Sequence, residues 1–349
     1  MNRWGCTCAS WVRYLLWSLW LFVTVSTAQD IQFSQFYSSS MYVNPAFAGS
    51  AHAGRLTSHT RYQWPKLDAR YFTTLASFDF IVPKTFSSIG IIALKDWQGS
   101  RNVTTSELHL IYSHEIHLSE TFTCRLGLQG GYVSRNINYA VLNFPDQFSN
   151  NGPLDMNTGE PFGLDKVTYV DVSSGALLYS KNIWISVAGH HLNMPNQSFY
   201  NKESRLPYKF SLAGGYKFIL NTKYSAGKGE IPLASLVPSI NYKMQGKSDQ
   251  LDLGLYYIRN NIMTGVWYRG LPLIKRYDRG LQNHESLALL LGWKNQDLSI
   301  SYSYDIIISK LNPALPGGAH EINLTYLFEF PKKRFKRYRT LPCPDFYKD

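Results

Sequence analysis

A two-residue alternation of apolar and polar side chains runs through most of the chain from about residue 55 onward. In residues 319–330, for example, Ile322 and Leu324 fall on one side of an extended strand, and Glu321 and Asn323 fall on the other. Successive side chains of a strand point to opposite faces, so each such segment predicts a strand with one apolar and one polar face.

The alternation predicts about fourteen strands, and most of them are long. A tilted strand that crosses a bilayer needs about 9–11 residues, whereas strands of soluble proteins usually have about 5–6. An even count is also typical of single-chain bacterial outer-membrane barrels. The predicted strands are 55–63, 70–80, 88–96, 103–118, 121–139, 167–179, 182–191, 207–220, 233–245, 249–259, 261–270, 284–294, 296–307 and 319–330.

The predicted connections alternate in length. Tight turns are expected at Ser119-Glu120, Ser180-Lys181, Asn260-Asn261 and Asn295-Gln296, and longer connections at 140–166, 192–206, 271–283 and 308–318. The connections at 81–87 and 221–232 depart from the rule, since they belong to the side of the tight turns without being tight. Outer-membrane barrels place their short turns in the periplasm, so this arrangement predicts that both termini are periplasmic.

Alternation alone leaves two folds open, a soluble sandwich or barrel with an apolar core and a membrane barrel with an apolar outer surface. The strand lengths and sorted loops favour an all-β, antiparallel transmembrane outer-membrane β-barrel of about 14 strands. Composition agrees: 15% of the residues are aromatic and only 17% are charged, against roughly 25% charged in soluble domains. Aromatic residues near strand ends are interpreted as interfacial girdles, and they include Trp64, Trp97, Trp184, Trp267, Trp293, Tyr268 and Tyr302.

The two ends of the chain lie outside the strand pattern. Residues 1–28 are predicted to be a signal peptide, with Arg3 and Arg13 before or at the start of a short apolar run and small residues up to Ala28. Residues 29–54 are then predicted to be a periplasmic N-terminal segment, residues 55–330 the barrel, and residues 331–349 a basic periplasmic C-terminal tail.

The sequence offers little chemistry. The histidines on predicted strands do not converge as metal ligands would, no Gly-x-Ser-x-Gly motif marks a nucleophile, and no glycine-rich phosphate loop is present. We therefore expect no enzyme, no catalytic, metal or cofactor site, and no nucleic-acid partner despite the net charge of +11. Cys124 and Cys343, which would remain after signal cleavage, are predicted to be free thiols.

Short segments in chain order resemble a known family. The stretches Gln32–Tyr37 and Tyr42–Ser50, the segment Trp267–Gly270 and the ending Pro342–Phe346 are similar to the PorP/SprF proteins of the type IX secretion system of Bacteroidetes. The resemblance implies an outer-membrane barrel that serves protein secretion or gliding motility, anchoring or delivering a secreted surface protein and contacting the periplasmic ring proteins of that system. It implies no catalytic residue.

The end segments are the candidate docking elements for the periplasmic partners. The candidate residues are Phe33, Gln35, Asn44, Pro45, Lys332, Lys333, Arg334, Pro342, Cys343, Pro344 and Phe346. Two other functions stay open: a passive porin-like or hydrophobic-solute channel, and a soluble exported binding module. A channel lumen would carry the residues of the polar strand faces, among them Glu107, Arg125, Lys209, Lys217 and Glu321.

Overall fold

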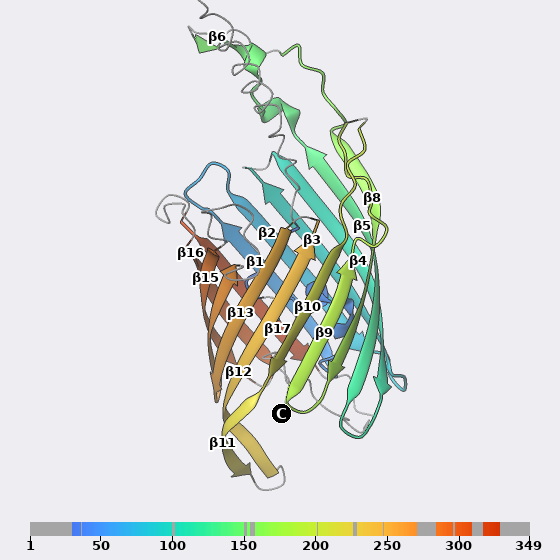
Figure 1. The fold of residues 1–349 in the computed structure, drawn as a ribbon, viewed down its shortest axis with the longest axis vertical. Coiled ribbons are helices and arrows are strands. Elements are labelled where there is room, and N and C mark those ends of the chain that lie inside the picture. The colour runs from blue at the N-terminus through green and yellow to red at the C-terminus, as the bar shows by residue number, and fades with distance from the viewer. Residues whose placement is uncertain are drawn as a thin grey trace, which may run out of the picture. The chain divides into compact units, whose positions relative to one another are not determined.

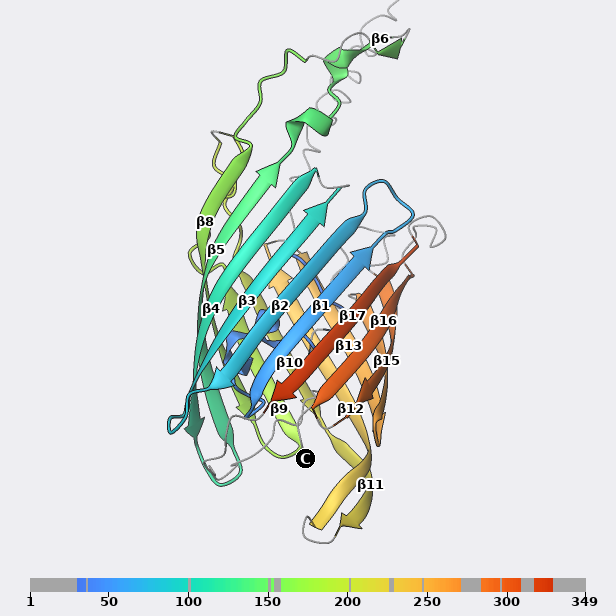
Figure 2. The ribbon, with the colours of Figure 1, turned by 180° about the vertical axis from the view of Figure 1, so that it is seen from behind.

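The strands form a closed antiparallel ring, as Figures 1 and 2 show for the computed structural model of the chain. The structure describes residues 30–35, 37–99, 102–149, 152–153, 158–200, 202–225, 229–246, 248–270, 284–295, 297–308 and 317–328. The predicted signal peptide and basic tail lie outside these residues. Among the described residues no helix is both long and apolar enough to cross a membrane.

The described elements are almost all strands. The short helices are α2 (Ser40–Val43), η1 (Pro45–Phe47), η2 (Tyr139–Val141) and η3 (Pro145–Gln147). The strands are β1 (Gly54–Gln63), β2 (Tyr71–Ile81), β3 (Ser87–Gln98), β4 (Val103–His117), β5 (Thr123–Ile137), β6 (Phe148–Ser149), β7 (Gly152–Pro153), β8 (Lys166–Tyr179), β9 (Ile183–His190), β10 (Lys209–Tyr216), β11 (Phe218–Ser225), β12 (Gly229–Gln245), β13 (Ser248–Arg259), β14 (Ile262–Gly270), β15 (His284–Lys294), β16 (Leu298–Ile307) and β17 (Ala319–Phe328).

Two pairings close the ring. The first strand, β1, pairs with the last, β17, from Gly54 opposite Phe328 to Gln63 opposite Ala319. On the far side β12 pairs with both β10 and β11, which follow each other along its edge. Counted as one interrupted strand, β10 and β11 bring the described ring to 14 strands, as the alternation predicts. The register of β1 and β17 also places the start and the end of the barrel at the same rim.

The barrel wall has its polar faces inside and its apolar faces outside. Along β17 the side chain of Glu321 is 0% exposed, while that of its neighbour Ile322 is 56% exposed. The same inversion recurs in β4, where Leu108 and Leu110 face outward and His109 is buried. A soluble barrel has the opposite arrangement, so the wall decides for a membrane barrel, whose outer surface contacts lipid.

The predicted sorting of the loops is confirmed with exceptions. One rim carries the tight connections at 118–122, 180–182, 260–261 and 295–297, and the other carries the long connections at 138–165 and 191–208. The long-loop rim also holds two short turns, at 99–102 and 246–247. The sorting therefore describes most of the connections of the barrel but is not strict.

The predicted connection at 221–232 is wrong. Residues up to Ser225 belong to β11, and β12 already begins at Gly229. Alternation could not find these strand ends, because the described side chains there are exposed on both faces and nothing requires one face to be apolar.

The girdle interpretation fails for two tryptophans. Trp184 and Trp267 are buried, and the Trp184 ring packs against Phe47 with ring centroids 6.1 Å apart. They point into the lumen because the lumen contains a chain segment with apolar side chains of its own.

Candidate functional site

The N-terminal segment fills the lumen of the barrel. Residues 31–51, hereafter the plug, run through the interior as an irregular chain that includes α2 and η1, and they appear blue inside the barrel in Figure 2. Nearly all of their described side chains are buried. A barrel of this strand number is too wide to be filled by the side chains of its own wall, and the plug supplies the missing contents.

The plug corrects the prediction of a periplasmic N-terminal segment at 29–54. Four residues that the sequence predicts to contact a partner protein are buried in the lumen instead: Phe33, Gln35, Asn44 and Pro45. The inward faces of the wall carry charges that need partners out of water, and the plug provides polar backbone groups for them. The other predicted docking residues, at 332–334 and 342–346, lie outside the described residues.

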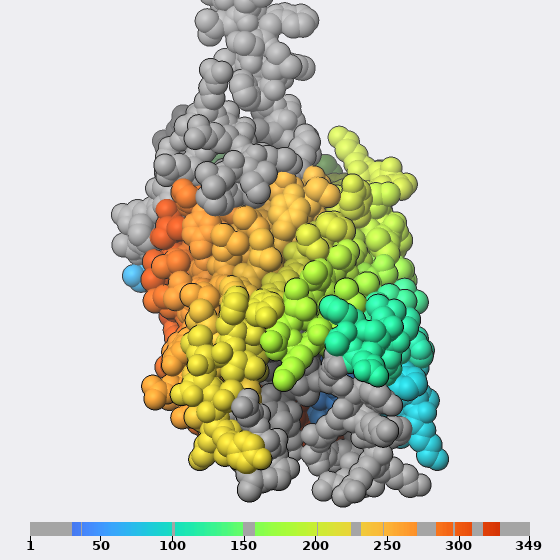
Figure 3. All heavy atoms as spheres, turned by 60° about the horizontal axis from the view of Figure 1, so that its bottom comes forward, coloured from blue at the N-terminus to red at the C-terminus, as the bar shows by residue number. Residues whose placement is uncertain are grey.

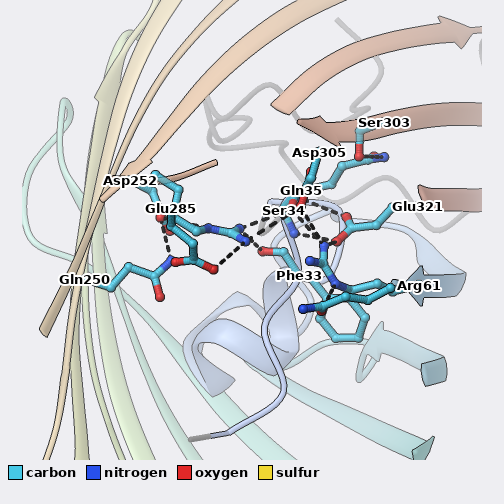
Figure 4. Close-up of polar contacts among 12 residues, drawn as sticks. Phe33, Ser34, Gln35, Arg61, Gln250, Asp252, Glu285, Ser303, Asp305 and Glu321 are labelled. Carbon is cyan, nitrogen blue, oxygen red and sulfur yellow. Dashed lines mark hydrogen bonds and ion pairs between the residues drawn. The ribbon is translucent and has the colours of Figure 1, made fainter. Parts of the chain in front are cut away.

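The start of the plug is held by a carboxylate on β17. Glu321 accepts hydrogen bonds from the backbone N–H groups of Ser34 at 2.7 Å and Gln35 at 3.0 Å. Arg61 of β1 pairs with the same carboxylate and, at 2.9 Å, with Asp305 of β16 (Figure 4). All of these groups are buried, so each charge depends on the others for the hydrogen bonds that water would otherwise give.

A second arginine approaches the start of the plug from β14. Arg269 of β14 donates to the carbonyl oxygen of Phe33 at 3.3 Å and to the hydroxyl of Ser34 at 3.2 Å. Its charge is balanced by Asp252 of β13, also at 3.3 Å (Figure 4). The start of the plug is therefore bound by side chains from β1, β14 and β17.

The middle of the plug is fixed by Asn44. Its amide nitrogen donates to the carbonyl oxygens of Ala176 and Val187, at 3.1 and 3.0 Å, and to the Ser186 hydroxyl at 2.8 Å. Its amide oxygen accepts from the N–H of Ala46 and so caps η1. One side chain thus joins the plug to β8 and β9 while it shapes the turn within the plug.

Paired glycines make room for this turn. Gly127 of β5 and Gly175 of β8 lie directly opposite each other in the sheet. A Cβ atom at Gly127 would lie 2.3 Å from the backbone nitrogen of Ala46, and one at Gly175 would lie 2.0 Å from the amide oxygen of Asn44. The glycines form a notch that lets the plug backbone touch the wall.

The end of the plug is held by two further arginine–carboxylate pairs. Asp79 of β2 accepts the backbone N–H of Gly49 at 2.6 Å and pairs with Arg55 at 2.8 Å. Arg125 of β5 pairs with Glu115 and donates to the carbonyl oxygens of Ala46 and Ala48. In each pair the acid balances the charge, and the spare N–H groups of the arginine bind plug carbonyls.

A serine, a histidine and a glutamate form a chain in the same region. Ser39 Oγ lies 2.5 Å from His59 Nδ1, and His59 Nε2 lies 3.3 Å from Glu321. The connectivity is that of a hydrolase triad. All three side chains are buried, however, and the Phe33 ring covers His59 with ring centroids 4.3 Å apart. While the plug is seated this chain joins it to the wall and leaves no access for a substrate.

The sequence predicts some of the wall residues that bind the plug and misses others. Arg125 and Glu321 were assigned to the lumen and lie there, whereas Arg55, Asp79 and Arg61 were not singled out. Their signal was present: each is a charged residue on the polar face of a strand in a barrel with few charges. Among the described residues no group of histidine, cysteine and acidic side chains could hold a metal ion, and Cys124 is a free thiol.

Fold and site together define an outer-membrane β-barrel whose lumen is filled by its own N-terminal segment. The chain belongs to the family of the type IX secretion system membrane protein PorP/SprF, whose model matches residues 25–326. None of the curated proteins compared matches the chain significantly.

Solved structures resemble the chain only distantly. The toluene transporter TodX of Pseudomonas putida has a TM-score of 0.46 at 9% identity, covering 87% of this chain and 96% of its own. BamA of Haemophilus ducreyi, lacking POTRA domains 1–3, has a TM-score of 0.41 at 11% identity, covering 79% and 70%. The KdgM porin has a TM-score of 0.32 at 8% identity, covering 79% and 99%.

Proposed function

We propose that this protein is a non-catalytic outer-membrane component of the type IX protein secretion or gliding machinery that works with its lumen closed. In this role it anchors or delivers a secreted surface protein and contacts the periplasmic ring proteins. Family membership supports the place in the machinery. The observation that carries the closed state is the plug, which is bound by buried ion pairs on several sides of the barrel.

The plug argues against the alternative of a passive channel. A porin needs a continuous aqueous path, whereas here Glu321, Arg269 and Asn44 bind a chain segment in the interior. To clear the lumen, several buried charge-assisted hydrogen bonds would have to break, each worth about 1.5–3 kcal/mol. Planar-bilayer conductance and liposome swelling test this point: a steady open pore in the purified wild-type protein would favour the channel.

The barrel rims support a periplasmic position of both termini. Gly54 and Phe328 lie at the rim that carries most of the tight turns, and outer-membrane barrels place that rim in the periplasm. Both termini would then be periplasmic, and the basic tail at 331–349 would be within reach of the periplasmic ring. Pull-down of the ring proteins with a variant truncated after residue 330 tests the tail, and undiminished recovery would exclude its role in docking.

The long-loop rim would face the cell exterior and the secreted protein. Its 138–165 connection carries an aromatic cluster in which the ring centroids of Tyr139 and Phe162 are 4.9 Å apart and those of Phe144 and Phe162 are 5.5 Å apart. Phe162 and Leu164 are more than half exposed, which suits an adhesive surface.

Secretion assays test the function as a whole. In a strain that lacks the gene, the wild-type chain should restore the surface protein, and a chain with residues 138–165 replaced by a short glycine-serine linker should insert normally but fail to restore it. Full restoration by the linker variant would contradict the proposed role of this rim.

A further inference from the structure

The hairpin of β11 and β12 extends beyond the barrel wall at the short-turn rim. On one side the neighbouring hairpin β8–β9 already turns back at 180–182, where Lys217 N–H donates to the Asn182 carbonyl at 2.7 Å. On the other side β13 turns into β14 at Asn260, whose N–H donates to the Leu233 carbonyl at 2.9 Å. Past these points β11 and β12 continue as a two-stranded ribbon, in which residues 222–225 pair with residues 229–232 (Figure 1).

Both faces of β11 are exposed. Leu220 is 57% exposed and Tyr224 is 79% exposed, and the polar residues Thr222 and Lys223 beside them are exposed as well. Over most of the described wall one face is buried against the lumen. The yellow atoms of the ribbon lie on the surface at this end of the barrel in Figure 3, which brings that end forward.

One edge of β11 is unpaired among the described strands. Its register pairs, from Phe218 opposite Leu236 to Ser225 opposite Gly229, all lie on β12. Such a row of backbone N–H and C=O groups cannot lie in hydrocarbon, where nothing satisfies it. In water it is a template for a further strand, and a two-stranded ribbon alone is only marginally stable.

The edge strand of the ribbon is basic. Residues 217–228 contain three lysines and no aspartate or glutamate, and the exposed Lys181 lies in the adjacent turn. The one acidic residue of the ribbon, Glu230, lies on β12 opposite Tyr224 and not on the free edge. Lysines on an edge discourage indiscriminate pairing and favour a segment with acidic side chains.

We propose that the β11–β12 ribbon docks an extended, acidic segment of a periplasmic protein, which adds as a strand to the free edge of β11. The inference rests on the proposed orientation and deepens it by naming the contact surface. It also supplies a periplasmic contact in place of Phe33, Gln35, Asn44 and Pro45, which the lumen buries.

Site-specific photocrosslinking in native envelopes tests the proposal. The full chain would carry p-benzoylphenylalanine at Thr222 or at Tyr224, and, as the control, at the outward-facing Tyr132 of β5. Both ribbon positions should link to the same acidic segment of one protein, at attachment points about two residues apart, because added strands keep the two-residue period. Tyr132 should not give this adduct.

Charge reversal sharpens the test. Lys223→Glu should lower the yield of the Tyr224 adduct about fivefold, because an attractive cross-strand pair becomes a repulsive one. The proposal is overturned by absent protein adducts, by adducts to lipid alone, or by attachment points that do not move in register. Surface protein is scored in the same cells. A chain that restores secretion without the adduct overturns only the docking, whereas an adduct without secretion supports the docking and overturns the proposed function.

Discussion

The notch at Gly127 gives the sharpest test of the plug. A Cβ atom there would lie 2.3 Å from the Ala46 nitrogen and 2.4 Å from the Pro45 carbonyl carbon, so Gly127→Ala must displace the plug backbone. The matched control is Gly130→Ala on the same strand, where a Cβ atom meets no heavy atom within 4 Å. Both substitutions remove a glycine from β5, so the difference between their effects reports only the contact between β5 and the plug.

The magnitude follows from the contacts that would be strained. Overpacking of a filled interior costs about 1–3 kcal/mol. Displacement would also weaken the three hydrogen bonds that Asn44 donates to β8 and β9, each worth about 0.5–1.5 kcal/mol. A middle value of about 3 kcal/mol shifts the balance between seated and displaced plug roughly a hundredfold, at about 1.4 kcal/mol per factor of ten.

Planar-bilayer recording of the purified full-length protein measures this shift. We expect Gly127→Ala to spend a far larger fraction of time in conducting states than either wild type or Gly130→Ala, and to unfold at a lower temperature. If Gly127→Ala conducts and unfolds like Gly130→Ala, the close contact between plug and wall does not exist as described, and the reasoning is refuted.

Three further variants test other parts of the barrel. Glu321→Gln removes one of the two carboxylates that pair with Arg61 and weakens the hydrogen bonds to the start of the plug. The free energy of unfolding in detergent should therefore fall by about 3–5 kcal/mol, and an unchanged denaturation midpoint would refute the buried network. Asp79→Asn should cost a similar amount, whereas Glu203→Gln, which breaks only an exposed pair with an arginine, should change the same midpoint by less than about 1 kcal/mol. Leu110→Arg, at an outward-facing position that is 63% exposed, should make the free energy of folding into lipid vesicles less favourable by about 2–4 kcal/mol. Leu164→Arg, at a loop position that is 57% exposed, should leave this free energy almost unchanged. Equal effects of the two substitutions would mean that the lipid-facing surface lies elsewhere.

The sequence determined the wall of the barrel. Alternation reports which face of a strand meets lipid or lumen, so it located nearly every strand, and tight turns such as Asn260-Asn261 followed from the gaps between them. It could not report the ends of β11 and β12, because a ribbon exposed on both faces has no alternation to detect.

The same limit applies to the family motif near the N-terminus. Residues 42–50 are distinctive in sequence but carry no periodicity, so nothing in the strand pattern could show that they fill the lumen and do not lie in the periplasm. Whether Asn44 lies in the periplasm or in the lumen depends on contacts with Ala176, Ser186 and Val187, more than 130 residues away along the chain.

The local pattern of the chain therefore predicts the barrel but does not predict the plug. Each strand has one apolar face toward lipid and one polar face toward the lumen, and the alternation of residues in the sequence shows which residues lie on which face. The closed lumen arises only when β1, β5, β14 and β17 come together in a ring. Only then do Arg125, Arg269 and Glu321 converge on the plug backbone, and Arg61 on the Ser34 hydroxyl.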